Sequence, residues 1–421
     1  MLKDKQVWKL EEIISNAKAH SPYYRELYKN CKDLKLSSLP VVDQAVFWKS
    51  SLLTSSEHDG LVFKSGGSTG APKYSYFTNQ EWESFTAYFG HGMSEGILES
   101  GDRVANLFYV GDLYASFLFI KDSLQSINVS KMSISQFPIA GQTDHYQILK
   151  TLDEFKINVI VGVPSAILSM LEKYNENKSQ FKNLNITKIL FGGEALYDDQ
   201  FKAFTDFLPG VKISSIGCAS VDGGLIGFSS RDCNNGEHRV FDGANIIEIV
   251  DPETNEVIME KNRTGKVLLT NLTRMRMPII RYPAGDLACW VEDAGSPNRK
   301  FKLQGRSDEA ARLGTLSVYF EDTREMISKL ASNVSGLQFQ MILKHHSHKD
   351  ELILRLSCHD INELNPLEEK ITEAFSREKT AYGELLKKDL IHPLKIEIVS
   401  NEKLESNSRT GKLKRIIDCR A

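Results

Sequence analysis

The spacing of apolar residues changes along the chain, and each spacing predicts a different kind of element. Near the N-terminus, apolar side chains recur every three or four residues, which is typical of an amphipathic helix. This helix should end near His20–Pro22, and a second short helix should begin at Tyr23. The first helix has one apolar face, made of Val7, Leu10, Ile13, Ile14 and Ala17. Packing is the expected role of both helices.

In the next part of the chain, apolar runs alternate with helical patterns. The predicted strands are Ala105–Val110, Ile127–Ile134, Val159–Val163, Ile186–Phe191 and Val211–Ile216. The predicted helices are Tyr146–Phe155, a helix that begins at Pro164, and Leu196–Phe207. This alternation favours parallel sheets with helices on their faces. Ligands of such folds bind at the carboxyl ends of the strands.

The pattern changes twice more toward the C-terminus. Between residues 237 and 306 the helical period disappears, and short strands are predicted at Ile246–Val250, Glu256–Met259 and Lys266–Thr270. Beyond Arg306 a β–β–α–β order follows, at Phe339–Leu343, Glu351–Leu356, Leu367–Phe375 and Leu394–Ile398. We therefore predict an α/β protein. Residues 1–307 form a large domain of parallel or mixed sheets with helices and a β-rich subdomain at 237–306, and residues 308–421 form a small α+β domain.

One stretch, SGGSTGAPK, stands out by its composition. It places hydroxyl residues and a lysine among glycines, at Ser65, Gly66, Gly67, Ser68, Thr69, Gly70 and Lys73. Successive backbone N–H groups in such a loop can form a nest for phosphate. An ordinary glycine-rich surface loop is the alternative. A strand at Leu61–Phe63 and a capping box of Thr78 with Glu81 flank the stretch and favour a phosphate site. The P-loop of nucleotide hydrolases does not fit, because it requires a Ser or Thr directly after its GK pair.

Five further motifs follow in order along the chain. They read FGGEAL, CASVDGG, RYPAGD, QGRSDEAARLG and SRTGKLKR, and begin at Phe191, Cys218, Arg281, Gln304 and Ser408. Together with the glycine-rich stretch, they resemble the ordered motifs of the adenylate-forming superfamily, which includes acyl-CoA synthetases and peptide-synthetase adenylation domains. The opening helix followed by SPYYREL is similar to the start of the phenylacetate-CoA ligases, a compact branch of that superfamily.

The resemblance implies a role in ATP binding for each motif. The glycine-rich loop would hold the β- and γ-phosphates. Gly192, Gly193 and Glu194 would shape a slot for the purine. Asp286 would bind the ribose hydroxyls, and Arg306 would reach the ribose or phosphate.

The motif CASVDGG departs from the family pattern, which has an aromatic residue, a glycine and a hydroxyl residue before its glutamate. Cys218, Ala219 and Val221 stand at those positions. We place Asp222 at the glutamate, which in the family helps to hold Mg²⁺, and Ser220 just before the α-phosphate contact. In another frame Ser220 takes the acidic position and the carboxylate is lost. The first frame is preferred because Mg²⁺ requires hard oxygen ligands.

The last two motifs imply a mobile C-terminal lid. Asp308 would be the hinge about which the small domain rotates. Lys412 would then reach the active site and stabilise charge as a carboxylate attacks the α-phosphate. Gly314 lies one residue earlier than the glycine of the family's pantetheine loop. The alternative for residues 408–415 is a solvated basic tail.

These assignments predict an AMP-forming acid–thiol ligase that uses ATP, Mg²⁺ and CoA. Phe108, Tyr109 and Tyr114 are candidates for the acid pocket and favour an aryl acid, although ordinary core packing explains them equally well. Alternative acceptors are a carrier protein, a protein thiol such as Cys358, or an amine. A catalytically degenerate nucleotide-binding relative is the remaining alternative.

Composition restricts the partners. The net charge is −3 over 421 residues, which gives no indication of nucleic-acid binding. Neither a membrane span nor a signal peptide is predicted. The six cysteines contain no CxxC pair, which suits a reducing cytoplasm. Cys233 and His238 alone do not make a closed zinc site, so no structural zinc is expected. The expected state is a monomer or homodimer.

Overall fold

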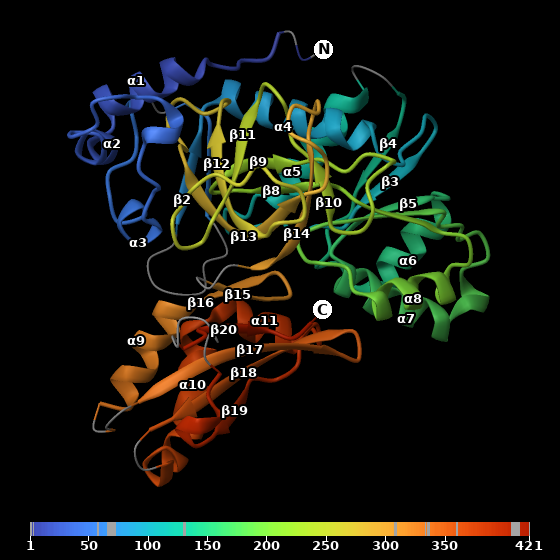
Figure 1. Ribbon diagram of the computed structural model, residues 1–421. Coiled ribbons are helices and arrows are strands. Elements are labelled where there is room, and N and C mark those ends of the chain that lie inside the picture. Colours follow the sequence, from blue (N-terminus) through green and yellow to red (C-terminus); the bar gives the residue numbers. More distant parts are fainter. Residues whose placement is uncertain are drawn as a thin grey trace. The chain divides into compact units, whose positions relative to one another are not determined.

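The computed structural model divides into two compact units (Figure 1). Over the described residues, the first comprises the chain up to Lys64, Lys73–Leu196 and Phe201–Gln304, and the second comprises Tyr197–Gln200 and the chain from Gly305. The structure describes all residues except 1, 3, 57–58, 65–72, 129–131, 307–309, 333, 335–336, 359–360, 406–412 and 421. The predicted boundary between residues 307 and 308 falls on residues outside this description and stays a prediction.

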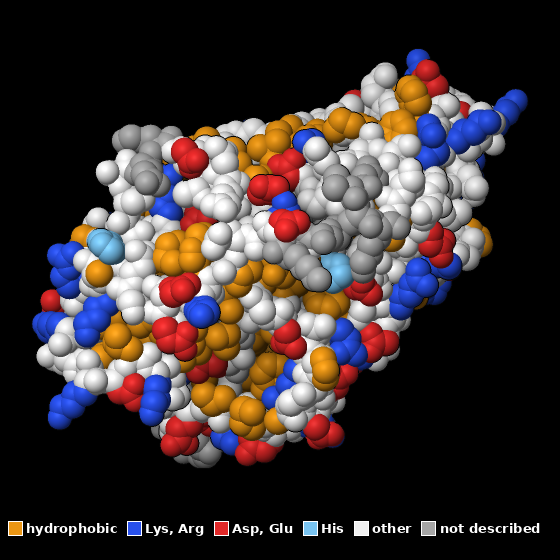
Figure 2. Space-filling view, turned by 90° about the horizontal axis from the view of Figure 1, so that it is seen from above, with side chains coloured by type: hydrophobic (Ala, Val, Ile, Leu, Met, Phe, Trp, Pro, Cys, Tyr) orange, Lys and Arg blue, Asp and Glu red, His pale blue; other side chains and the backbone are white. Residues whose placement is uncertain are grey.

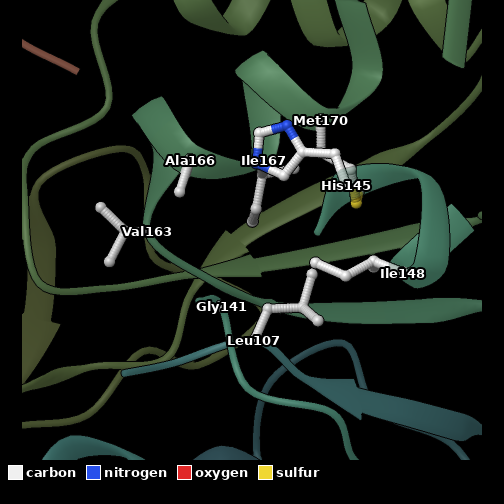
Figure 3. Close-up of a pocket in the computed structure, with 8 residues that line it drawn as sticks. All are labelled: Leu107, Gly141, His145, Ile148, Val163, Ala166, Ile167 and Met170. Carbon is white, nitrogen blue, oxygen red and sulfur yellow. The ribbon is translucent and has the colours of Figure 1, made fainter. Parts of the chain in front are cut away.

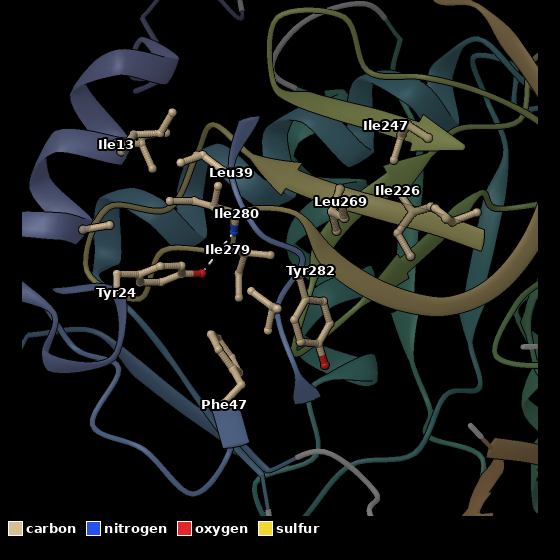
Figure 4. Packing of buried hydrophobic residues seen from close by; sticks show 14 of the residues in the cluster. Ile13, Tyr24, Leu39, Phe47, Ile226, Ile247, Leu269, Ile279, Ile280 and Tyr282 are labelled. Carbon is tan, nitrogen blue, oxygen red and sulfur yellow. Dashed lines mark hydrogen bonds between the residues drawn. The ribbon is translucent and has the colours of Figure 1, made fainter. Parts of the chain in front are cut away.

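Short helices open the chain, as predicted. They are α1 (Leu10–His20), α2 (Pro22–Leu27) and α3 (Gln44–Phe47). The predicted apolar face of α1 is buried through Ile13, Ile14 and Ala17. Figure 4 shows Ile13, Tyr24 and Phe47 in one cluster with residues of the later antiparallel sheet. This cluster anchors the first 50 residues or so to a distant part of the sequence.

The strands on either side of the glycine-rich stretch form an antiparallel pair. They are β1 (Leu61–Lys64) and β2 (Tyr74–Phe77). Thr78 then caps α4 (Asn79–Ser94): its hydroxyl accepts a hydrogen bond from the Glu81 N–H, and the Glu81 carboxylate accepts one from the Thr78 N–H. The predicted strand and capping box are confirmed.

The main parallel sheet has the strand order β4-β3-β5-β6-β7. Its strands are β3 (Arg103–Asn106), β4 (Ser135–Pro138), β5 (Val159–Gly162), β6 (Lys188–Phe191) and β7 (Lys212–Ser215). The connecting helices are α5 (Ser116–Asn128), α6 (His145–Glu154), α7 (Pro164–Glu176) and α8 (Asp198–Phe207). Along β5, Val159 and Val161 face a cluster shared with α4 and α5, whereas Ile160 faces a cluster with α6 and α7. Because side chains alternate along a strand, both faces of the sheet are covered.

A β-rich part follows the parallel sheet. The hairpin β8 (Cys218–Ser220) and β9 (Gly224–Gly227) leads into an antiparallel sheet with the order β10-β14-β13-β12-β11. The strands of this sheet are β10 (Glu237–Arg239), β11 (Asn245–Val250), β12 (Gly265–Asn271), β13 (Tyr282–Trp290) and β14 (Lys300–Arg306).

The second unit contains the predicted β–β–α–β order. It begins with a hairpin of β15 (Ala310–Leu313) and β16 (Leu316–Tyr319), and α9 (Phe320–Leu330) follows. A sheet in the order β19-β18-β17-β20 packs against helices. Its strands and the helices between them are β17 (Gln338–His346), β18 (Lys349–Ser357), α10 (Glu368–Glu378), α11 (Thr380–Lys387), β19 (Lys395–Ile398) and β20 (Ile416–Asp418).

Two predicted strands are wrong. Ile127 lies in the last turn of helix α5, which ends at Asn128, residues 129–131 lie outside the described part of the chain, and the strand starts only at Ser135. The error arises because a short apolar run does not distinguish a buried helix end from a strand. The stretch Glu256–Met259 forms no strand but makes one isolated bridge, between Val250 and Val257. The strand predicted at Ala105–Val110 is also shorter, ending at Asn106.

The outer surface mixes charges of both signs. On the face seen in Figure 2, Lys and Arg side chains are interspersed with Asp and Glu side chains. This agrees with the small net charge. Over the described residues, every helix is too short or too polar to cross a bilayer.

Two buried tyrosines, Tyr24 within α2 and Tyr28 at its C-terminal end, provide a matched test of the N-terminal packing. The Tyr24 hydroxyl donates to the Pro278 carbonyl at 3.0 Å and accepts from the Ile280 N–H at 3.2 Å. The buried Tyr28 hydroxyl has no hydrogen-bond partner among the described residues. Tyr24→Phe should therefore lower the free energy of unfolding by about 1–3 kcal/mol, because it strands two buried backbone groups. Tyr28→Phe should be neutral or stabilising. Urea denaturation of both variants checks this, and equal losses would contradict it.

Candidate active site

Two predicted motifs lie at the carboxyl ends of neighbouring parallel strands. Gly192–Glu194 follow β6, and the segment that leads to Cys218 follows β7. The Ile216 N–H donates to the Phe191 carbonyl at 2.9 Å. A Cβ on Gly192 would lie 2.5 Å from the Ile216 Cδ1 atom, so any larger residue would have to displace the Ile216 side chain. The fold therefore brings the second and third motifs together.

Glu194 also has a structural task. Its carboxylate accepts a hydrogen bond of 2.6 Å from the Ser165 N–H, in the first turn of α7. A carboxylate at a helix N-terminus satisfies backbone donors and the positive end of the helix dipole. This role was not expected from the sequence.

Asp222 lies in the turn between β8 and β9, where it is partly buried. Its Oδ2 accepts from the Tyr282 hydroxyl at 3.0 Å, and its Oδ1 accepts from the Gly223 N–H at 3.1 Å. Burial alone would raise the pKa of this carboxyl. The charge of Lys73 and hydrogen bonds with Ser220 and Tyr282 outweigh burial, and the pKa lies below its usual value. The carboxylate is therefore ionised and available to a cation.

A fully buried arginine holds this turn. Arg274 donates to the Asp222 carbonyl and to the Tyr76 carbonyl, each at 3.0 Å. Its guanidinium also lies 4.1 Å from the centre of the Phe77 ring. Burial lowers the pKa of Arg274 to about 10, which still leaves it charged near neutral pH. Arg274 thus ties the Asp222 turn to β2, the strand that follows the glycine-rich stretch.

Lys73 is the part of the glycine-rich motif that the structure describes. Its Nζ lies 3.3 Å from Gln44 Oε1 and 5.4 Å from the centre of the Trp48 ring. The other assigned residues of that loop, at 65–70, lie outside the described part of the chain. Since Lys73 lowers the pKa of Asp222, the structure places these two predicted charges close enough to interact.

Asp286 lies on β13, where its charge acts on Cys218 and His238. Burial, followed by the charge of Asp286, raises the pKa of the Cys218 thiol well above its usual value, so the thiol stays protonated. The His238 ring is buried and forms a 3.2 Å hydrogen bond with the Ser215 hydroxyl. The fold thus brings the predicted ribose ligand next to the segment that follows β7.

The candidate acid-pocket residues differ in burial. Phe108 is buried beside Gly192, whereas Tyr109 is about one-third exposed and meets Tyr114 edge to face at 5.6 Å. A small cavity near them has room for about one water molecule (Figure 3). Leu107 and His145 help to line it, and Leu107 belongs to the cluster on the face opposite Phe108. This cavity is therefore separate from the candidate acid pocket.

The remaining site predictions concern the second unit and the end of β14. Arg306 ends β14, and its side chain is not among those described. Asp308 and Lys412 lie outside the described residues. Gly314 lies in the β15–β16 hairpin, where its N–H donates to the buried Asp350 carboxylate at 2.9 Å. Asp350 also accepts from Arg420 at 2.7 Å, so this hairpin is firmly fixed within its unit.

Comparison with known proteins adds the context for this geometry. No protein-family model matches the chain. A phenylacetate-coenzyme A ligase of Aromatoleum evansii is 24% identical, and the alignment covers 99% of this chain and 94% of the relative. An indoleacetate–lysine synthetase of Pseudomonas savastanoi is 27% identical over 59% of each chain. Phenylacetate-coenzyme A ligases of other bacteria match as well, among them that of Thermus thermophilus at 22% identity over 86% of this chain and 82% of the relative.

The fold is shared with solved enzymes. A 2-hydroxyisobutyryl-CoA ligase, solved with its acyl-AMP and CoA, superposes with a TM-score of 0.73 at 17% identity, over 98% of this chain and 89% of that chain. The amide bond synthetase McbA from Marinactinospora thermotolerans gives a TM-score of 0.55 at 12% identity, over 84% of this chain and 67% of that chain. These findings place the chain in the adenylate-forming superfamily, near the phenylacetate-CoA ligase branch.

Several residues that contact the predicted site residues were not predicted from the sequence. Gln44 and Trp48 come from the N-terminal segment, to which no motif was assigned. Arg274 was missed because nothing in its local sequence shows that its side chain reaches the carbonyls of Tyr76 and Asp222. Tyr282 could have been found, since it stands inside RYPAGD beside a residue that was singled out.

The pair considered for zinc has other partners in this member of the superfamily. Cys233 Sγ lies 3.3 Å from the Ser230 hydroxyl, and His238 bonds to Ser215. Across the described ranges, no three or more His, Cys, Asp or Glu side chains converge as metal ligands. The expected absence of structural zinc stays a prediction.

His238 predicts a pH dependence of stability. Burial lowers its pKa to about 4 in the folded protein, against about 6.5 in an unfolded chain. The unfolded state therefore binds the proton first as pH falls from about 6.5 to 4, and stability falls over that window by up to about 3 kcal/mol. In His238→Gln this contribution should disappear. Urea denaturation at pH 4.5 and 7 measures the change in the free energy of unfolding between the two pH values. The exposed His20→Gln is the control and should behave like the wild type. The same change in His238→Gln as in the wild type would contradict the prediction.

Proposed function

We propose that the protein activates a carboxylic acid with ATP and transfers the acyl group to the thiol of CoA. The observation that carries this proposal is the Asp222 carboxylate in the β8–β9 turn, which accepts a hydrogen bond from Tyr282 and lies close enough to Lys73 for that charge to lower its pKa. The similarity to phenylacetate-coenzyme A ligases along nearly the whole chain supports it. ATP and Mg²⁺ are then the first substrate and its metal, and CoA is the acceptor.

The described residues fit a magnesium ion that is bound together with nucleotide. Mg²⁺ in such sites takes one or two carboxylates and completes its shell with phosphate oxygens and water. Asp222 supplies one ionised carboxylate, and each of its oxygens uses only part of its accepting capacity on the protein bonds named above. When bound, the ion would neutralise phosphate charge.

The chain's own residues would then carry the first half-reaction. A substrate carboxylate oxygen attacks the α-phosphorus of ATP, the bond from that phosphorus to the bridging oxygen of pyrophosphate breaks, and acyl-AMP forms. In our proposal Lys73 and the residues at 65–70 bind the phosphates, and Asp286 binds the ribose. Lys412 stabilises the charge that develops at the α-phosphate. The Glu194 carboxylate and Gly192–Gly193 line the purine slot.

The second half-reaction transfers the acyl group. The CoA sulfur attacks the acyl carbonyl, AMP leaves with the electron pair of the anhydride bond, and the thiol proton passes to solvent. We propose that rotation about Asp308 exchanges Lys412 for the thiol entrance. Phe108 supports an aryl acid, because its ring lies beside Gly192, in the glycine pair that follows β6. Tyr109 and Tyr114, whose rings meet edge to face, would extend this aromatic lining.

The test is a screen of carboxylic acids for pyrophosphate release with ATP and Mg²⁺. Release that depends on an aryl acid, followed by a CoA thioester identified by mass spectrometry, is expected. If no carboxylic acid raises the rate above background while ATP binds, a degenerate nucleotide-binding protein is the better description.

An amine acceptor is a second candidate. The observation in its favour is the 27% identity to an indoleacetate–lysine synthetase, which is higher than the identity to the CoA ligases. Incubation of the enzyme and acid with lysine in place of CoA separates the two: an amide product without a thioester would favour the amine.

A further inference from the structure

The segment from Gln44 to Trp48 is fastened to the strand that carries RYPAGD. The Gln44 side-chain amide donates to the Pro283 carbonyl at 2.6 Å, and just before it the Val42 N–H donates to the Arg281 carbonyl at 3.2 Å. Phe47 is fully buried and packs on the Tyr282 ring at 5.5 Å, as Figure 4 shows. This segment therefore has a fixed position relative to the candidate active site.

Two side chains of the segment, Gln44 and Trp48, contact Lys73, and Trp48 also contacts Tyr282, the hydrogen-bond partner of Asp222. The Gln44 carbonyl oxygen accepts from Lys73 at 3.3 Å, and Lys73 lies over the Trp48 ring. The Trp48 indole N–H donates to the Tyr282 hydroxyl at 3.1 Å, and that hydroxyl lies 3.0 Å from Asp222 Oδ2. The two charges are thus held from one side by residues of a single short segment.

The direction of the second chain of hydrogen bonds follows from its chemistry. An indole N–H can only donate, and a tyrosine hydroxyl has one proton to give. Because Tyr282 accepts from Trp48, its own proton points to the ionised Asp222. Hydrogen bonds in such a chain polarise one another, so the bond to the carboxylate is strengthened by the indole behind it.

We infer that Gln44, Trp48 and Tyr282 are positioning residues for the ATP site. Gln44 sets the place of the Lys73 ammonium, and Trp48, acting through Tyr282, sets the place of the Asp222 carboxylate for the metal. This inference rests on the proposed function, because it takes Lys73 and Asp222 as ligands of Mg²⁺·ATP. Through Gln44 and Trp48, it adds to that function a segment of the chain that none of the six motifs covers.

Affinity for ATP, measured by calorimetry with Mg²⁺ and with EDTA, tests the inference without turnover. Tyr282→Phe should weaken Mg²⁺·ATP binding roughly tenfold, as a hydrogen bond to a charged group is lost. Trp48→Phe keeps an aromatic ring beneath Lys73 and loses the N–H, and should weaken Mg²⁺·ATP binding a few-fold. Both should leave the affinity for metal-free ATP within about twofold. Gln44→Ala should weaken binding in both conditions.

The double variant Trp48→Phe/Tyr282→Phe separates positioning from general damage. If Trp48 acts through Tyr282, the double variant should bind Mg²⁺·ATP no more weakly than Tyr282→Phe, within about twofold. Trp290→Phe is the matched control, since it removes another buried indole bond, of 3.0 Å to the Ile258 carbonyl, far along β13. It should change neither affinity.

The outcomes distinguish the inference from the function on which it rests. If the wild-type protein does not bind Mg²⁺·ATP, both are wrong. If it binds, and the Trp48 and Tyr282 effects multiply or appear equally in EDTA, only the inference is wrong. Thermal melting of each variant identifies any that fails to fold. If Trp48→Phe or Tyr282→Phe fails to fold, the other of the two and Gln44→Ala test the inference, and unchanged Mg²⁺·ATP affinity in both would contradict it.

Discussion

Asp222→Asn is expected to lower carboxylate-dependent pyrophosphate release by about a hundredfold or more. The change keeps the size of the side chain and its contact with the Tyr282 hydroxyl, but removes the negative charge that Mg²⁺ requires. Apparent affinity for Mg²⁺ should fall with it. Pyrophosphate release at several Mg²⁺ concentrations, with the acid found in the screen, is the measurement.

A matched control isolates the position of this charge. Asp232 forms ion pairs with Arg239 of β10 and Lys300 of β14, and the side chain of Asp232 is half exposed. Asp232→Asn removes one carboxylate from the same unit and should leave the rate within about twofold. If Asp222→Asn were as active as Asp232→Asn, the frame that places Asp222 at the metal would be wrong, and Ser220 would stand at that position.

Lys188→Met is expected to destabilise the first unit by about 3–5 kcal/mol, because it leaves a buried carboxylate without its cation. Lys188 and Asp102 are each only 4% exposed, and the Lys188 Nζ lies 2.8 Å from Asp102 Oδ2. Burial lowers the pKa of Lys188, but hydrogen bonds with Asp102 and Glu99 outweigh it and the pKa is raised, so the buried lysine stays charged. The free energy of unfolding from urea denaturation at neutral pH is the measurement.

An exposed pair provides the comparison for this loss. Lys202 and Asp206 are four residues apart on α8, and both side chains are mostly exposed to solvent. Lys202→Met should change stability by less than about 0.5 kcal/mol, because water and salt screen such pairs. If both lysine variants lost the same small amount, the buried pair would not stabilise the start of β3 and β6 as we argue.

The spacing of apolar residues along the chain predicted the elements of the fold well wherever it was regular. The helix Tyr146–Phe155 and the buried strand Val159–Val163 appear within a residue or so of their predicted bounds. It failed at Ile127–Ile134 because Ile127 belongs to the last turn of α5 and β4 starts only at Ser135, and the few apolar residues between them have no clear period. The strand at Glu256–Met259 failed because a turn at Asp251 and an isolated bridge took the place of a ladder.

The site was predicted in part, because some of its residues stand in recognisable motifs and others do not. Asp222, Lys73 and Asp286 stand in ordered motifs, so a single sequence suggests their roles. Gln44 and Trp48 stand in no motif, and their partners lie 29 and 234 residues away. A contact of that kind depends on how distant segments pack, which no local pattern specifies.

Residue order alone determined the chemistry that this chain offers: a glycine- and hydroxyl-rich turn, a series of loops after predicted strands, and an acidic residue in each of several motifs. Tertiary structure alone decided that Asp222 is ionised, because its pKa depends on burial and on Lys73 and Tyr282 together. It also decided that an arginine with no exposed surface, Arg274, joins the Asp222 turn to β2. The physical reason is that motifs fix which groups are present, whereas the charge and position of a group depend on neighbours that only folding brings together.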